Sequence, residues 1–300
     1  MLAKKFKLHT NHDLVFTKDS FQKTFFLFFS FIIKNPKTYI LFLIFPFFPL
    51  LIMLFIWTVA IDANIYPPML INFLALNIVL CAFFTIPILL NWKNSIILKR
   101  IKINGVSKFH FILVLYLIFI PLFMISVLFN MLIFFILTKL GIHVLQSFLS
   151  PIIDFVNVSL GNFTAYTLII SFFILVMFAM FLFSILLIVI FKMNKNSYIR
   201  LTLFGFLLFT LIFSDIIVNS QMSSQWEWMV IIGYFSPGRY FMWFALFINS
   251  YANIDPLGMT QIIDYVSGQA SFPKMWIPSL ISIILLSIST PISFKLFNWR

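Results

Sequence analysis

The stretch FTAYTLIISFFILVMFAMFLFSILLIVIF, residues 163–191, decides the fold class because it contains no charged side chain. A helix needs roughly 20 predominantly apolar residues to cross the hydrocarbon core of a bilayer. This stretch is longer than that, so it predicts a membrane-spanning helix. Five further apolar runs are long enough to do the same. The six predicted spans are residues 38–60, 69–90, 109–137, 163–191, 201–218 and 275–296.

The composition of the 300-residue chain agrees with a membrane protein. Apolar residues make up 62% of it and charged residues 9%, whereas soluble domains average about 45–50% and about 25%. A soluble enzyme, a disordered chain and a disulfide-stapled secreted domain are therefore excluded. Cys81 is the single cysteine, so no internal disulfide can form. We expect an all-α polytopic membrane protein with six transmembrane helices.

Two apolar segments are predicted not to cross. Residues 24–33 are too short and are flanked by lysines, which favours a helix lying in the membrane interface. Residues 1–37 are therefore expected to form a cytoplasmic tail and this interfacial helix, with the six-span domain over 38–300. Residues 229–248 carry Pro237, Gly238 and Arg239 in their middle, and a central Arg costs about 2.5–3.5 kcal/mol on insertion scales. Two short helices that enter from one side, a re-entrant pair, fit this segment better.

Arg239, with its neighbours Pro237 and Tyr240, is a candidate gate. Arg239 contacting substrate is one reading. The other is an Arg that snorkels to the outer interface among aromatic residues, where a cation–π contact is available. Asp215 either pairs with Arg239 or caps a helix.

The net charge of +12 indicates topology rather than nucleic-acid binding. With six spans, all but three of the 20 Lys and Arg residues fall on one side of the membrane, the exceptions being Lys139, Arg239 and Lys274. Cytoplasmic loops of membrane proteins carry such an excess. Both termini are therefore expected in the cytoplasm, with the chain in the cell membrane.

Residues 92–105, between spans two and three, predict a short amphipathic helix on this cytoplasmic side. One interpretation is an interfacial helix that binds anionic lipid. The other is a docking helix for a soluble partner. Its candidate contact residues are Ser95, Ile97, Leu98, Lys99, Arg100 and Ile101.

Three stretches resemble the type-2 family of ATP-binding-cassette (ABC) exporter permeases. They are KNPKTYILFLIFPFFPLL (34–51), SIILKRIKINGVSKFHFIL (95–113) and YFSPGRYF (234–241). The resemblance implies an N-terminal connecting helix, a cytoplasmic coupling helix over 92–105 and a re-entrant pair before the last span. It also implies two partners, which are a cytoplasmic ABC ATPase that binds ATP and Mg, and a second permease chain in a homo- or heterodimer. The family often has Glu at the start of the coupling helix, where this chain has Asn91 to Asn94, so we expect the charged part of the ATPase contact to be small.

The chain itself is expected to perform no chemistry. No G-x-G-x-x-G or G-x-x-x-x-G-K motif is present to hold a nucleotide, and neither a metal site nor a cofactor is predicted. The expected function is a permease subunit that moves an amphiphilic, peptide or lipid-like substrate outward. Three alternatives stay open: an ATP-independent membrane enzyme or maturation factor, an ion-coupled carrier, and a sensing or immunity subunit that moves nothing. The first would need a polar catalytic cluster and the second intramembrane carboxylates.

Overall fold

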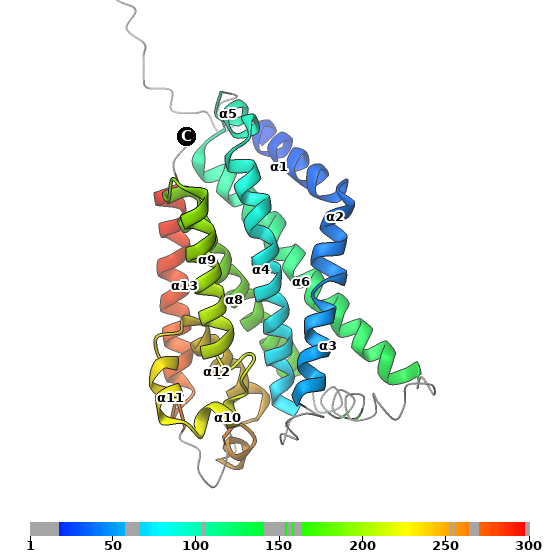
Figure 1. Ribbon diagram of the computed structural model, residues 1–300, viewed down its shortest axis with the longest axis vertical. Helices are drawn as coiled ribbons and strands as arrows, with labels where there is room; N and C mark the ends of the chain where they lie inside the picture. The colour runs from blue at the N-terminus through cyan, green and yellow to red at the C-terminus, as the bar shows by residue number, and fades with distance from the viewer. Residues whose placement is uncertain are drawn as a thin grey trace, which may run out of the picture.

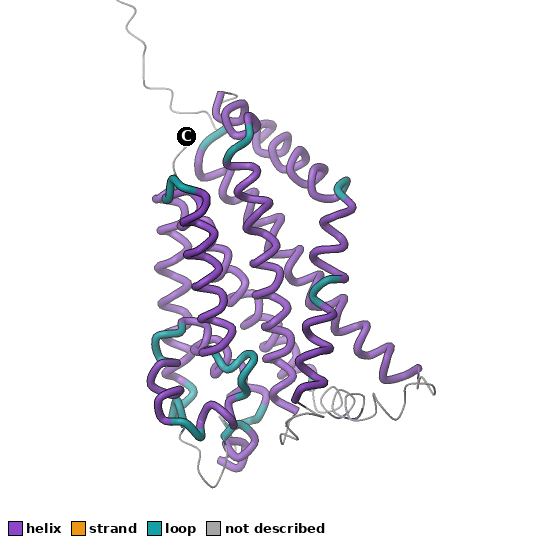
Figure 2. Tube along the Cα trace, in the orientation of Figure 1, coloured by secondary structure: helices purple, strands orange, loops and turns teal. Residues whose placement is uncertain are grey.

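The computed structural model describes residues 18–57, 67–103, 106–140, 154, 158, 164–252, 254, 256–263 and 270–297. These residues form helices joined by short connections, and no strand occurs among them. Figure 1 shows the long helices side by side in one bundle, with α5 (Ile96–Ile103) at one end and α10 (Ser220–Ser224) at the other. We refer to these as the α5 end and the α10 end. The described loops lie mostly at these two ends (Figure 2). The predicted tail, residues 1–17, lies outside the described residues.

Within the described chain, six helices are long and apolar enough to cross a membrane, so the prediction of an all-α multi-pass membrane protein is confirmed. The six spans are Pro36–Phe55, α4 (Leu70–Lys93), α6 (Lys108–Leu140), α8 (Ala165–Lys192), α9 (Asn196–Phe213) and α13 (Trp276–Leu296). The fifth differs most from its predicted range of 201–218. Helix continues through the polar residues 196–200 at the α5 end, and it stops at Phe213 because Asp215 takes a left-handed backbone conformation with φ of 58°.

The first span is interrupted by a π-helical turn that comes before Pro46 and Pro49. It consists of α2 (Pro36–Tyr39), a π-helical turn η1 (Ile40–Ile44) and α3 (Phe47–Phe55). The Phe45 N–H donates to the oxygen of Ile40, five residues back, at 2.8 Å. Pro46 has no N–H to offer the oxygen of Phe42, and the hydroxyl of Ser126 in α6 donates to that oxygen instead. Such replacement donors let prolines persist in membrane helices.

Helix α1 (Lys18–Ile33) contains the segment that was predicted to lie in the membrane interface. It lies at an angle across the α5 end of the bundle (Figure 1). Its helix begins at Lys18, before the apolar run. Phe28 is buried against Trp92 and Phe111, with ring centroids 4.7 and 5.6 Å away. The opposite side exposes large apolar residues, among them Phe26, Leu27, Phe29 and Phe31. One face of α1 is therefore anchored to α4 and α6, while the other is available to lipid.

Buried polar side chains connect the central helices. The hydroxyl of Tyr116 in α6 lies 2.7 Å from that of Ser184 in α8 and 3.0 Å from that of Ser293 in α13. Asn77 in α4 accepts a hydrogen bond from Ser126 in α6 at 3.0 Å. Asn77 and Ser184 thus each link two helices of the bundle. Such a link is worth about 0.6 kcal/mol on average in a membrane.

The segment between the fifth and sixth spans contains short helices. These are α10, α11 (Glu227–Gly233), α12 (Pro237–Asn249) and the 3-10 helix η4 (Pro256–Gln261). At 1.5 Å per residue, the 13 residues of α12 extend about 20 Å, less than the roughly 30 Å hydrocarbon core. Helices α11 and α12 are the predicted helical pair, and neither crosses.

Candidate functional site

The predicted coupling segment contains a helix that is shorter than expected. Helix α4 continues to Lys93, and a turn then leads to α5. The Ser95 N–H and hydroxyl both point to the oxygen of Trp92, at 3.0 and 2.7 Å, and this closes the turn. Gly105, the predicted end of the helix, lies outside the described residues.

The two faces of α5 differ in exposure, which corrects the predicted contact surface. Leu98 and Ile101 are only 7% and 6% exposed, because they face the interior of the chain. They cannot supply the apolar contact area for a partner. Ile96 and Ile103, which the prediction omitted, are 68% and 82% exposed.

The structure describes the exposure of only two of the other four predicted contact residues. Lys99 is exposed beside this surface, and Ser95 is half-buried in the turn. The side chains of Ile97 and Arg100 lie outside the described part of the structure. Ile96, Lys99 and Ile103 are thus the described residues of α5 that a partner can reach, and we call them the α5 surface.

Lys93, the last residue of α4 before the turn to α5, contacts the C-terminal end of α8. Its Nζ donates to the oxygens of Ile190 and Met193 at the C-terminal end of α8, both at 2.6 Å. The last carbonyls of a helix lack intrahelical donors, and a cation is favoured there. The sequence contains no signal for this contact, because its partners lie about a hundred residues away in the chain. The link holds the α4–α5 corner against the α8–α9 turn.

Arg239, the candidate gate residue, is fully buried, so it does not snorkel to an interface. Its Nε lies 3.0 Å from Oδ2 of Asp215, which forms an ion pair. The Nε–H has no aligned hydrogen-bond acceptor among the described atoms, although the two charges are in contact. Of the two roles considered for Asp215, pairing is therefore the one observed.

The guanidinium of Arg239 also holds α11 and the approach to α13. Nη1 donates to the oxygens of Met229 and Val230 at 3.0 and 3.1 Å, and Nη2 donates to the hydroxyl of Ser271 at 2.8 Å. Gly233 packs directly over this group, since a Cβ added there would lie 1.4 Å from Nη1. These contacts occupy the guanidinium of Arg239.

Asp215 itself accepts two further hydrogen bonds, and Ile217 nearby accepts a third. Its Oδ2 accepts the indole N–H of Trp243 in α12 at 2.6 Å, and its main-chain oxygen accepts from Asn72 of α4 at 2.7 Å. Two residues later, the oxygen of Ile217 accepts the indole N–H of Trp57 at 2.9 Å. The α10 end is therefore a connected polar network rather than an open gate.

The other two gate candidates have local roles. Pro237 occupies the first turn of α12, where its missing N–H costs nothing. The hydroxyl of Tyr240 donates to the oxygen of Tyr234 at 2.9 Å. The pKa of the Tyr240 phenol is raised, mainly by partial burial and to a smaller extent by the nearby Tyr234. Arg239 opposes this shift. Tyr240 is therefore a neutral donor at physiological pH.

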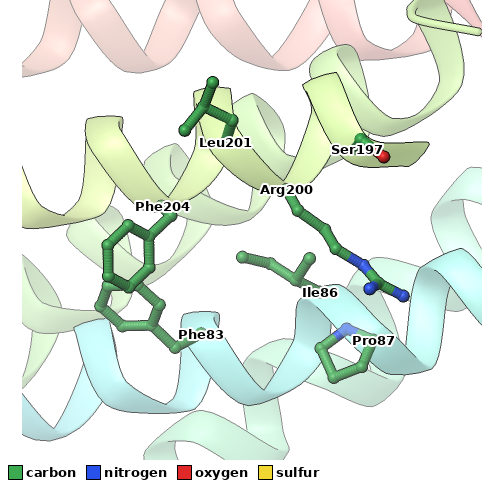
Figure 3. Close-up of a pocket in the computed structure, with 7 residues that line it drawn as sticks. All are labelled: Phe83, Ile86, Pro87, Ser197, Arg200, Leu201 and Phe204. Atoms are coloured by element: carbon green, nitrogen blue, oxygen red, sulfur yellow. The ribbon is translucent and has the colours of Figure 1, made fainter. Parts of the chain in front are cut away.

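A groove of about 670 Å³ lies between α4 and α9, and no feature of the sequence predicted it. In Figure 3 the side chain of Arg200 extends from α9 toward Pro87 of α4, while Phe83 and Phe204 lie together at the opposite end. Leu201 and Phe204 are 70% and 53% exposed, so the groove is open to the side of the bundle. The lining residues are Phe83, Ile86, Pro87, Ser197, Arg200, Leu201 and Phe204.

Neither a group of metal-ligating side chains in the described structure nor a similar known protein indicates the function of the chain. Among the residues that the structure describes, no three His, Cys, Asp or Glu side chains are grouped so that they could hold a metal ion. No protein-family model, curated protein or solved structure matches the chain. The features of the described structure that bear on function are therefore the α5 surface, the α10-end network and the groove.

Proposed function

We propose that this chain is the membrane-spanning permease subunit of an ATP-driven exporter of the ABC type. It works with a separate cytoplasmic ATPase, which binds ATP and Mg, and with a second permease chain. In this proposal the chain lies in the cell membrane with both termini and the α5 end in the cytoplasm. It carries out no hydrolysis itself.

The observation that carries the proposal is a short helix with exposed apolar side chains at the lysine-rich end of the bundle. Ile96 and Ile103 are exposed on α5, with Lys99 beside them. Lys93 connects the base of this helix to the end of α8. A force applied to the α5 surface is therefore passed to the core spans α4 and α8, as alternating access by rigid-body rocking requires.

The layout supports the same proposal. An interfacial helix precedes the six spans, α5 lies between the second and third, and a helical pair precedes the last. The buried Asp215–Arg239 pair counts against an ion-coupled carrier, because its charges already neutralise each other.

The test is capture of the ATPase from native membranes in mild detergent, with mass spectrometry of the co-purified proteins. A cassette ATPase is expected with the unaltered chain. Replacing Ile96 and Ile103 together by Ser removes the exposed apolar area and should reduce capture at least tenfold. Ile254→Ser is the matched control, since Ile254 is 73% exposed in the loop after α12.

Salt concentration separates the apolar part of the contact from the charged part. Apolar burial is not screened by salt, whereas exposed ion pairs are. Capture should therefore survive high salt. ATP hydrolysis by the purified chain alone, or equal capture by the double variant, would overturn the proposal.

A further inference from the structure

The groove between α4 and α9 has two chemically different ends. Phe83 and Phe204 are in edge-to-face contact at one end, with ring centroids 5.7 Å apart. The guanidinium of Arg200 extends across toward Pro87 at the other end (Figure 3). An apolar molecule alone would leave Arg200 unused, and a small anion alone would leave the aromatic end empty.

The direction of the groove follows from the position of these residues in α9. The helix begins at Asn196 at the α5 end, so Arg200 lies one turn inside it. Phe204 lies another turn, about 6 Å, further toward the middle of the span. The cationic end thus faces the α5 end of the bundle, and the aromatic end lies deeper.

The lining residues leave the positive charge of Arg200 without a matching acidic group in the groove. None of the seven is Asp or Glu. Arg200 is exposed at the groove, so a ligand can reach its guanidinium, and the planar fork of this group binds carboxylate and phosphate oxygens in pairs. Charge complementarity therefore selects an anionic head group at this position.

The size and opening of the groove fit a molecule with one hydrocarbon tail. A volume of about 670 Å³ lies within the roughly 300–1,000 Å³ range of small-molecule sites. The exposed Leu201 and Phe204 leave a lateral route from the lipid phase.

We infer that this groove binds an anionic single-tailed amphiphile taken from the leaflet at the α5 end. The head group pairs with Arg200, and the tail lies along Ile86, Phe83 and Phe204. As the cargo class of the exporter, this ligand rests on the proposed function. The binding itself is a property of the isolated chain, so it can fail while ATPase capture succeeds, and the reverse.

The probe is a matched pair of ligands with the same twelve-carbon tail, dodecyl phosphate and dodecylphosphocholine. Each is titrated into the purified full chain in a non-ionic detergent, and native mass spectrometry measures the bound fraction. Dodecyl phosphate should bind at least tenfold more tightly than the zwitterionic ligand. Equal binding of the two would overturn the inference.

Variants locate the site. Arg200→Gln should raise the Kd for dodecyl phosphate about tenfold, the effect of losing a charge-assisted hydrogen bond. Arg200→Lys should retain part of the affinity, because it keeps the charge but loses the fork. Lys34→Gln is the control for net charge, since Lys34 is exposed after α1 and away from the groove.

A second pair of variants, one with its control, tests the aromatic end of the groove. Phe204→Ala should weaken binding of dodecyl phosphate several-fold, whereas Phe173→Ala should not, although Phe173 is 62% exposed on α8. Size-exclusion chromatography verifies folding of each variant. A chain dimer that excludes dodecyl phosphate, and that dissociates in Leu201→Trp, would overturn the inference by showing that a second copy covers the groove.

Discussion

The Nζ of Lys93 lies 2.6 Å from the main-chain oxygen of Met193, at the point where α8 ends and the turn to α9 begins. The same Nζ donates to Ile190, so one side chain fastens the α4–α5 corner to two carbonyls of another span. Hydrogen bonds made by a charged donor are worth about 1.5–3 kcal/mol. This contact links the corner beside the α5 surface to the end of α8.

Replacing Lys93 by Met keeps the apolar stem and removes the charged donor. We expect a loss of about 1.5–3 kcal/mol in the free energy of unfolding. Amide hydrogen exchange should also rise at residues 190–196. Lys99→Met, at an exposed position on α5, is the control and should change neither. Unchanged exchange in Lys93→Met would show that the link does not hold the corner.

The Asp215–Arg239 pair predicts strong coupling between its two members. Removing one partner of a buried pair leaves an uncompensated charge, which costs about 3–5 kcal/mol. Arg239→Gln and Asp215→Asn should each lower the thermal unfolding temperature in detergent by a large amount. The double variant should lose clearly less than the two single losses added together. Additive losses would mean that the two residues act independently.

Two glycines provide a matched test of packing at the α10 end. Gly233→Ala places a methyl group 1.4 Å from Nη1 of Arg239, whereas Gly205→Ala meets no atom within 4 Å. The first should destabilise the protein by about 1–3 kcal/mol through overpacking. The second lies inside helix α9 and should stabilise it by about 0.5–1 kcal/mol. Equal effects on the unfolding temperature would contradict the position of Arg239 under Gly233.

Topology is tested with reporter tags. All but three of the 20 basic residues fall on one side of the six-span arrangement, so tags at residues 1 and 300 should both report the cytoplasm. A tag after residue 157 should report the opposite side. A C-terminal tag found outside would mean an odd number of spans and would place residues 229–248 across the membrane.

Hydropathy was sufficient to predict the spans, because each is a long run with almost no charge. The prediction that residues 229–248 do not cross came instead from Pro237, Gly238 and Arg239 in the middle of an otherwise apolar stretch. Partners far apart in the chain were harder to predict. Pairing with Arg239 was one of two roles predicted for Asp215, and the observed pairing depends on a turn in which Asp215 has a positive φ.

The α5 surface shows a second limit of prediction from sequence. Both faces of the helix carry isoleucine or leucine, so periodicity could not distinguish Leu98 and Ile101, which face inward, from Ile96 and Ile103, which face outward. That choice is made by how the neighbouring helices cover α5. The groove escaped prediction for a similar reason, since Phe83 and Phe204 are ordinary residues until α4 and α9 lie side by side.

The π-helical turn in the first span has a consequence for the angular phase of its side chains. Thr38, Phe42, Pro46 and Leu50 are buried at a strict spacing of four residues. In an uninterrupted α-helix each step of four overshoots a full circle by about 40°, so Leu50 would be rotated about 120° from Thr38. The extra residue accommodated by Ile40–Ile44 takes up about 100° of that rotation and keeps all four on the inner side. Deleting one residue from the turn would therefore restore a regular α-helix and keep Leu50 on the inner side, within about 20° of Thr38.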